Sequence, residues 1–435
     1  MKEYDLEMTQ ENLKYSIEND TLDRNCKLNK LIELLNAIKG NKIISLDGKW
    51  GCGKTFFLKQ LEYINKNNFV LKDKFNDDNI KLFKEKYEVY YYNAWENDMH
   101  SSPLLSLIYN LINDYPKEKD QTASGKVESP FDVIEGLKTV SQNFINLDKV
   151  KTYKDLTQEI HTSEEKRNAL SNIINNILPT NKKLIFIVDE LDRCRPDYAI
   201  NMIEIIKHFY SNERIIFLLG TNNLQLSHTI SNFYGSNFDG YGYLNKIYNL
   251  IIELGDVPIK KYIEKITARK DSSTWCDIDF YGVCEYFNFS MREINRLLND
   301  FELLDEYMNT SYGGTFSEDS IVKYLFLPYC LGLKIVDRIG LSEFLEGKGY
   351  SSLKKFVFTN EELTKILKRC YESQKRIGEQ ITEDQLLKEI DDYLEEKYNI
   401  YFLNKITDWY IEENKKKFLD IFSLLSGHSK IFVED

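Results

Sequence analysis

A short stretch near the N-terminus has the residue types and spacing of a phosphate-binding loop. The stretch from Gly48 to Thr55 reads GKWGCGKT and fits the pattern GxxxxGK[ST] at every position. Glycines let the backbone turn its N–H groups toward an anion, and the helix that opens after the loop adds a favourable dipole. We expect Lys54 to reach the β- and γ-phosphates and Thr55 to offer its hydroxyl to Mg²⁺. The other nucleotide contacts are assigned to Gly48, Trp50, Gly51, Cys52 and Gly53.

Two adjacent acids follow a continuous apolar run later in the chain. The run LIFIV (184–188) is typical of a strand buried on both faces, and Asp189 and Glu190 come directly after it. Parallel sheets open toward their ligands at the carboxyl ends of their strands, so a carboxylate there can hold Mg²⁺. We predict Asp189 as the metal-linked acid and Glu190 as the residue that polarises an attacking water.

Basic residues lie close behind these acids in the stretch DELDRCRP (189–196). Arg193 is expected to pair with Asp192 or with Asp189, because a guanidinium suits a carboxylate. An alternative is that Arg193 or Arg195 reaches a neighbouring subunit or its nucleotide. Both interpretations stay open at this point.

Strands and helices must bring these residues together. Helical spacing over 22–39 and 56–66 flanks the apolar run KIISLDG (42–48), which predicts helix, strand, glycine loop and helix. The alternation continues with strands and helices expected at 86–95, 102–114, 157–178, 182–192, 196–210 and 213–223. From about residue 240 the pattern becomes almost wholly helical. This order predicts an α/β fold, a three-layer core with a mostly parallel sheet, followed by an all-helical region.

Composition narrows the class of protein. The formal net charge of -12 over 435 residues argues against general affinity for nucleic acid, although a local basic patch or an oligomeric pore stays open. Seven scattered cysteines without a CxxC pair indicate a reducing compartment, so we expect a cytoplasmic protein. The first residues have no apolar h-region, so we expect no signal peptide, and charges and a proline interrupt the longest apolar run near the C-terminal third, at 321–336. We therefore expect no membrane attachment.

Together these motifs resemble the KAP family of P-loop NTPases. The matching stretches are spread over about residues 20–300 and are DGKWGCGKT (47–55), YYNAWEND (91–98), DELDRCRP (189–196), LLGTN (218–222), GYLNKI (242–247) and SMREINRLLN (290–299). Many members carry transmembrane helices between the two nucleotide motifs, whereas this chain has a polar insertion there. Trp95 is expected to pack in the core at the end of its strand, and Glu96 and Asp98 could face the site.

The resemblance also implies roles for single residues. Asn222 corresponds to a polar sensor beside the γ-phosphate, although an Asn after a strand can also be a turn former. Arg292 corresponds to the arginine that a helical lid brings to the γ-phosphate, with Arg296 as the alternate. Lys246 could act in trans at a subunit interface. Residues 22–24 match the stretch that covers the nucleotide base.

The resemblance divides the chain into three expected domains. These are a P-loop NTPase core over 1–240 with an insertion at about 115–165, a helical lid over 241–300, and a C-terminal helical domain over 301–435. The last could pack only on itself or present a surface to a partner or to another subunit.

The expected function is a Mg²⁺-dependent ATPase that acts as a nucleotide-driven switch. The resemblance implies ATP as cofactor, and a homo-oligomer or an effector protein encoded nearby as partner, plausibly in bacterial antiphage defence. Alternatives are a P-loop kinase, a non-hydrolysing ATP-binding scaffold and a nucleic-acid motor. The adjacent Asp189 and Glu190 favour activation of water over phosphoryl transfer, and with Lys54 and Thr55 they complete a hydrolytic set.

Overall fold

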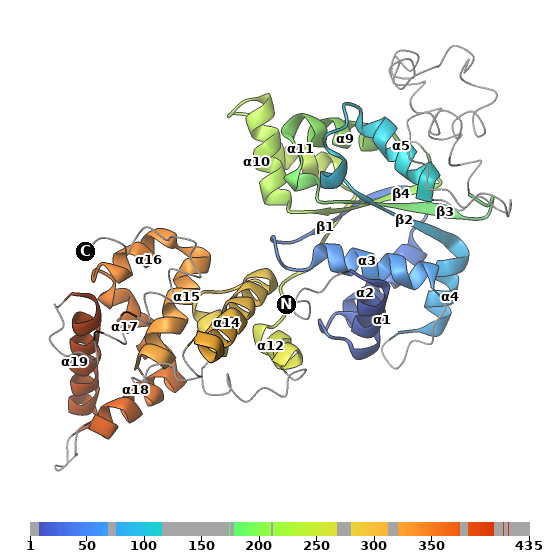
Figure 1. The fold of residues 1–435 in the computed structure, drawn as a ribbon. Coiled ribbons are helices and arrows are strands. Elements are labelled where there is room, and N and C mark those ends of the chain that lie inside the picture. Colours follow the sequence, from blue (N-terminus) through green and yellow to red (C-terminus); the bar gives the residue numbers. More distant parts are fainter. Residues whose placement is uncertain are drawn as a thin grey trace. The chain divides into compact units, whose positions relative to one another are not determined.

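Five parallel strands form one sheet in the N-terminal part of the chain in the computed structural model (Figure 1). The structure describes residues 8–67, 75–114, 178–209, 212–267, 280–311, 321–374 and 382–403, with single positions at 174, 412 and 416. Contacts within the chain divide it into two units, one of residues 7–256 and one of residues 257–435 together with 1–6.

The strand order in the first unit is β2-β3-β4-β1-β5. The strands are β1 (Lys42–Asp47), β2 (Tyr87–Asn93), β3 (Lys183–Asp189), β4 (Ile215–Thr221) and β5 (Leu250–Glu253). The first four lie within the predicted apolar runs, and β4 is buried along its whole length, as a strand covered on both faces should be. Because β1 and β3 both run parallel to β4, which lies between them, the segments that follow these two strands emerge at the same edge of the sheet.

Strand β5 corrects the prediction of helix from about residue 240 onward. The strand is short, and its register pairs Ile44 with Leu250 on the edge of β1. Asn249 sets this pairing, because its side chain accepts a hydrogen bond from the Ile43 N–H and its own N–H donates to the Ile43 carbonyl, each at 2.8 Å. In so short a strand, the alternation of apolar and polar residues cannot be distinguished from the helical spacing of the neighbouring segments.

Helices cover both faces of the sheet (Figure 1). One face carries α1 (Gln10–Asn19), α2 (Asn25–Ala37), α3 (Lys54–Lys66) and α4 (Asp77–Lys86), and the other carries α5 (Pro103–Asp114), α9 (Pro196–Phe209), α10 (Asn223–Tyr234) and α11 (Gly240–Ile247). Phe186 and Phe217 of the sheet pack with Met202 of α9 in the buried core of the second face. The predicted three-layer α/β core is confirmed. The insertion at 115–165 and nearly all of the helix predicted over 157–178 lie outside the described residues.

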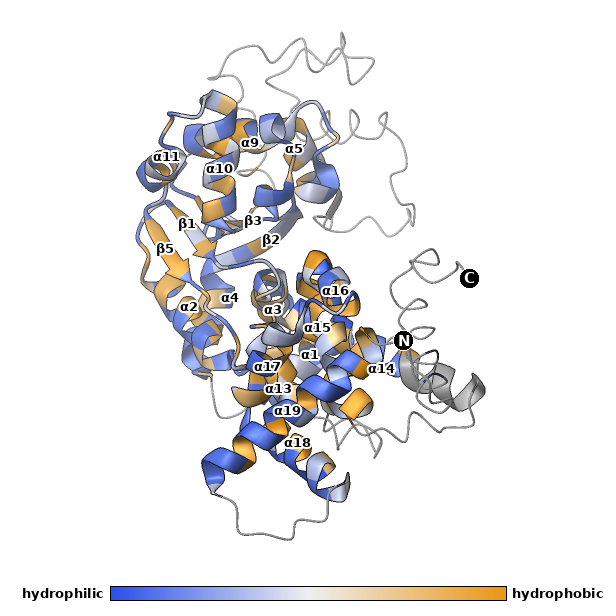
Figure 2. Ribbon diagram, turned by 90° about the vertical axis from the view of Figure 1, so that its left-hand side faces the viewer, coloured by the Kyte–Doolittle hydropathy of each residue, from blue (hydrophilic) through white to orange (hydrophobic). Residues whose placement is uncertain are grey.

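The second unit is helical throughout its described part. Its helices are α12 (Ile259–Thr267), α13 (Phe280–Tyr286), α14 (Met291–Ser311), α15 (Leu327–Val336), α16 (Arg338–Leu345), α17 (Tyr350–Phe358), α18 (Glu361–Gln374) and α19 (Glu383–Phe402), with a π-helical turn at Val322–Phe326. Figure 2 shows hydrophilic and hydrophobic residues alternating along α18. Aromatic rings fill the interior, where Phe344 contacts Tyr329, Tyr398 and Phe402. The segment 409–425 lies outside the described residues apart from 412 and 416.

Two further expectations concern this region. The unit boundary falls after Asp256, later than the predicted boundary at 240, because α11 packs on α10 and β5 pairs with β1. The apolar run at 321–336 forms buried helical turns, with Cys330 and Leu331 fully covered. Among the helices of the described ranges, none is long and apolar enough to cross a bilayer.

Candidate active site

The phosphate loop joins β1 to α3 and has the backbone shape that its glycines predict. Gly51 and Gly53 have φ angles of 80° and 85°, a region that side chains disfavour. Gly53 caps α3, so the N-terminal end of that helix, with its partial positive charge, faces the loop. A Cβ on Gly48 would lie 2.7 Å from the Cys52 sulfur, and Cys52 itself is buried. Cys52 therefore fills space behind the loop.

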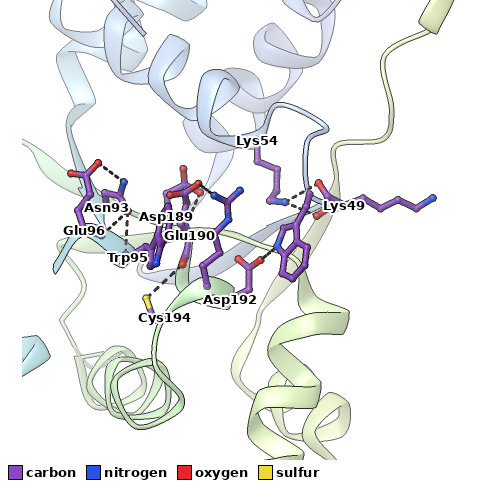
Figure 3. Close-up of polar contacts among 12 residues, drawn as sticks. Lys49, Lys54, Asn93, Trp95, Glu96, Asp189, Glu190, Asp192 and Cys194 are labelled. Atoms are coloured by element: carbon purple, nitrogen blue, oxygen red, sulfur yellow. Dashed lines mark hydrogen bonds and ion pairs between the residues drawn. The ribbon is translucent and has the colours of Figure 1, made fainter. Parts of the chain in front are cut away.

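Lys54 folds back over this loop. Its Nζ donates to the carbonyl oxygen of Gly48 at 2.5 Å and to that of Lys49 at 3.1 Å (Figure 3). Both acceptors are uncharged, whereas phosphate oxygens would give shorter and stronger charge-assisted bonds. The buried ammonium and the surrounding backbone therefore fit an anion at the loop.

Asp189 ends β3 and is completely buried. Its carboxylate accepts hydrogen bonds from the Tyr91 hydroxyl at 2.9 Å and from the Glu190 N–H at 3.0 Å. Burial raises the pKa of Asp189 to about 6, although hydrogen bonds from Thr55 and Tyr91 act in the opposite direction. The nearby Glu190 charge raises this pKa further. A buried carboxylate beside the Thr55 hydroxyl fits a Mg²⁺ site.

Glu190 follows in a left-handed conformation, with φ of 59°. Its N–H also donates to the Gly220 carbonyl on β4 at 3.1 Å, which holds the backbone in place. Its Oε1 pairs with Nη1 of Arg193 at 2.9 Å. The prediction that Arg193 pairs with Asp192 or Asp189 is therefore wrong. Glu190 is the N-cap of the short 3₁₀ helix η3 (Leu191–Arg193), and this tight turn brings Arg193 back beside the Glu190 side chain.

Two tryptophans flank this turn, and neither is buried. Trp50 of the phosphate loop donates from Nε1 to Asp192 at 2.5 Å, which ties the loop to the turn after β3. Trp95 is 50% exposed, so the expectation that it packs in the core is wrong. Its ring faces the Arg193 guanidinium, 5.5 Å from the ring centroid. The 3₁₀ helix η1 (Trp95–Asn97) turns Trp95 outward after β2 and leaves Ala94 as the buried residue.

The NAWEND and DELDRCRP stretches hold each other. The Arg195 N–H donates to the Asp98 carboxylate at 3.0 Å, and the Arg195 guanidinium donates twice to the Asp98 carbonyl, at 2.6 Å and 3.0 Å. Asn93 stays within its own turn, where it accepts from the Trp95 N–H and donates to Glu96. The sequence alone gave no chemical role for NAWEND. In the structure, its Asp98 anchors Arg195 and thereby the DELDRCRP stretch.

The remaining predicted residues divide between the two units. Asn222 lies directly after β4 at the same edge as Asp189, and its side chain caps α10 by accepting from the Gln225 N–H at 3.3 Å. This is the turn-forming role, and a sensor role stays a prediction. Lys246 is exposed near the end of α11. Arg292 and Arg296 lie near the start of α14 in the second unit, and their predicted roles are untested.

Arg24 has a structural role that the sequence did not indicate. Its guanidinium is 2% exposed and donates to the Gly255 carbonyl at 2.8 Å, and it lies close enough to Cys52 to interact with it electrostatically. Burial lowers the pKa of Arg24. Lys27 binds the neighbouring Leu254 carbonyl at 2.5 Å. The two cations anchor the segment that leads out of the first unit.

The comparison with known families agrees with this geometry. The model of the KAP family P-loop domain matches residues 24–308. This range includes the phosphate loop, the acids after β3 and the start of α14. No curated protein matches the chain.

Proposed function

The chain belongs to the KAP family of P-loop NTPases, and on that premise we propose that it is a Mg²⁺-dependent ATPase. The family implies nucleotide binding and hydrolysis. One observation supports the proposal most strongly: Lys54, Asp189 and Glu190 lie at the same edge of the sheet, at the carboxyl ends of β1 and β3, which both pair with β4. The choice of ATP over GTP rests on the family resemblance.

Each residue has a defined task in this proposal. Lys54 exchanges its two carbonyl partners for phosphate oxygens. Thr55 and Asp189 would hold Mg²⁺, which supplies positive charge to the β- and γ-phosphates when bound. Glu190 orients a water for in-line attack and accepts its proton. Asn222 would help to orient that water, and the family resemblance assigns Arg292 the role of adding positive charge.

We further propose that ATP turnover drives a switch. Binding and hydrolysis would shift the protein between two states that differ in assembly or in contact with a partner. A second copy of the chain or an effector protein is the expected partner, and a role in bacterial antiphage defence follows from family association alone.

A non-hydrolysing scaffold is the second candidate. The Arg193–Glu190 ion pair favours it, because one oxygen of the expected catalytic acid is already occupied. The complete set of Lys54, Thr55, Asp189 and Glu190 favours the ATPase instead. A P-loop kinase would use the same loop but needs an acceptor for the phosphoryl group.

The ATP affinity of a phosphate-loop variant tests whether this loop binds the nucleotide. Lys54→Ala should weaken Mg·ATP binding by about 100-fold or more, because a buried charge-assisted contact to phosphate is lost. Lys66→Ala, at the far end of the same helix, is the matched control and should bind as wild type does. Solution mass with and without Mg·ATP, measured on the same samples, tests the switch. Equal ATP affinity in Lys54→Ala and wild type would contradict the proposed site.

A further inference from the structure

The side chain expected to activate water is held by a neighbour from its own turn. Glu190 and Arg193 meet at 2.9 Å, and their side chains are only 13% and 21% exposed. Two hydrogen bonds from the Glu190 N–H, to Gly220 and to Asp189, fix the backbone from which the carboxylate extends. The carboxylate can therefore change its direction only by side-chain rotation, and rotation breaks the ion pair.

A second contact holds Arg193 in this position. Its guanidinium lies over the ring of Trp95, which comes from the turn after β2. That turn is itself fixed, because Ala94 donates its N–H to the Asp189 carbonyl at 3.0 Å and Asp98 binds Arg195. Trp95 thus forms a fixed shelf under Arg193, and half of its surface faces solvent.

The turn that carries Glu190 and Arg193 is also hydrogen-bonded to the phosphate loop. Asp192, between Glu190 and Arg193 in sequence, accepts the hydrogen bond from Trp50. Figure 3 shows Lys54, Asp192 and Glu190 along one stretch of the site. This hydrogen bond therefore connects the phosphate loop to the turn that carries Glu190 and Arg193.

We propose that Arg193 is a positioning residue that restrains Glu190, and that hydrolysis requires this ion pair to open; the inference rests on the proposed ATPase function. A carboxylate takes a proton from water only through an oxygen that faces the water. While Arg193 occupies Oε1, the Glu190 carboxylate is drawn toward the shelf on Trp95. Once the pair opens, the acid turns to the water and accepts its proton as the water oxygen bonds to the γ-phosphorus. The bond between the γ-phosphorus and the β,γ-bridging oxygen breaks, and its electron pair leaves with ADP, so that ADP and inorganic phosphate form.

Steady-state phosphate release measures this restraint. Arg193→Gln removes the charge but keeps a polar side chain, and it should raise kcat by about tenfold with an unchanged KM for Mg·ATP. Arg193→Lys keeps a cation for Glu190 and should stay within about twofold of wild type. Trp95→Ala removes only the shelf and should raise kcat by about threefold.

Two controls make the result specific. Lys182→Gln removes an ion pair to Glu88 of similar exposure at the opposite end of β3, and its turnover should equal that of wild type. The double variant Arg193→Gln with Glu190→Gln should have no turnover, because the added activity must pass through Glu190.

The possible outcomes distinguish failure of the proposed Arg193 restraint from failure of the proposed ATPase function. Turnover in Arg193→Gln that is equal to or below wild type, in a protein whose activity depends on Glu190, overturns the restraint and leaves the ATPase standing. A rise in kcat that survives in the double variant also overturns it. Absence of Glu190-dependent turnover in wild type and in every variant overturns the proposed function itself.

Discussion

The two sides of the candidate site differ in how their charged groups are partnered. On the loop side, Lys54 donates to the neutral carbonyl groups of Gly48 and Lys49. On the acid side, Glu190 is already paired with the cation of Arg193. To bind ATP, Lys54 needs only to exchange carbonyl oxygens for phosphate oxygens. To activate water, Glu190 must first lose its ion pair with Arg193. In the proposed ATPase, nucleotide binding and hydrolysis would therefore be separable steps, with the restraint acting on hydrolysis.

The largest expected effect comes from a residue that joins both sides. Gly220 lies on β4, and a Cβ there would come within 2.3 Å of the Asp189 carboxylate and 2.5 Å of a Leu58 methyl on α3. Gly220→Ala should lower the free energy of unfolding by about 3 kcal/mol, as overpacking does in a tight core. It should also weaken ATP binding, because α3 carries the loop. Chemical denaturation measures the first effect, and a midpoint equal to that of wild type would contradict this packing.

A substitution on the acid side alone should have the opposite sign. Burial raises the pKa of Asp189 from 3.8 to about 6, so the folded protein holds this proton more tightly than the unfolded chain. Its contribution to stability is fully present below about pH 3.8 and is lost as the pH rises through about 6. Asp189→Asn does not titrate and should be more stable than wild type by about 2 kcal/mol near pH 8 in Mg²⁺-free buffer.

Melting curves of both proteins from about pH 5 to about pH 8 check this expectation. The gap between Asp189→Asn and wild type should widen as the pH rises. A gap that stays constant, or an Asn variant that is less stable near pH 8, would show that burial of the Asp189 charge carries no such cost.

The smallest effect belongs to the link between the two sides. Trp50→Phe keeps an aromatic ring in the loop but loses the hydrogen bond to the buried Asp192. We expect a loss of about 1 kcal/mol in the free energy of unfolding. Trp95→Phe is the matched control and should stay within about 0.5 kcal/mol, because Trp95 is half exposed. Urea denaturation of both variants makes the comparison, and equal values would remove the proposed link.

The parts of the fold that the sequence predicts are those that local physics determines. Glycine spacing in the phosphate loop and the continuous apolar runs of β1, β3 and β4 each constrain the backbone on their own. The order of the strands then brings Lys54 and Asp189 to one edge without any detail of side-chain packing. The family match over 24–308 agrees with the motifs that carry the resemblance.

The parts that the sequence does not predict depend on the geometry of short turns and on contacts between distant segments. The partner of Arg193 depends on the left-handed turn at Glu190, which periodicity cannot show. The outward direction of Trp95 depends on a 3₁₀ turn after β2. The anchoring of Arg195 by Asp98 joins two motifs that lie far apart in the chain.

The most direct test of the central claim is phosphate release by wild type and by Glu190→Gln under saturating Mg·ATP, with bound ATP measured in both. We predict that both proteins bind ATP equally well and that turnover in Glu190→Gln falls by about 100-fold or more. Equal turnover in the two proteins would contradict it, because Glu190 would then have no part in activating the water.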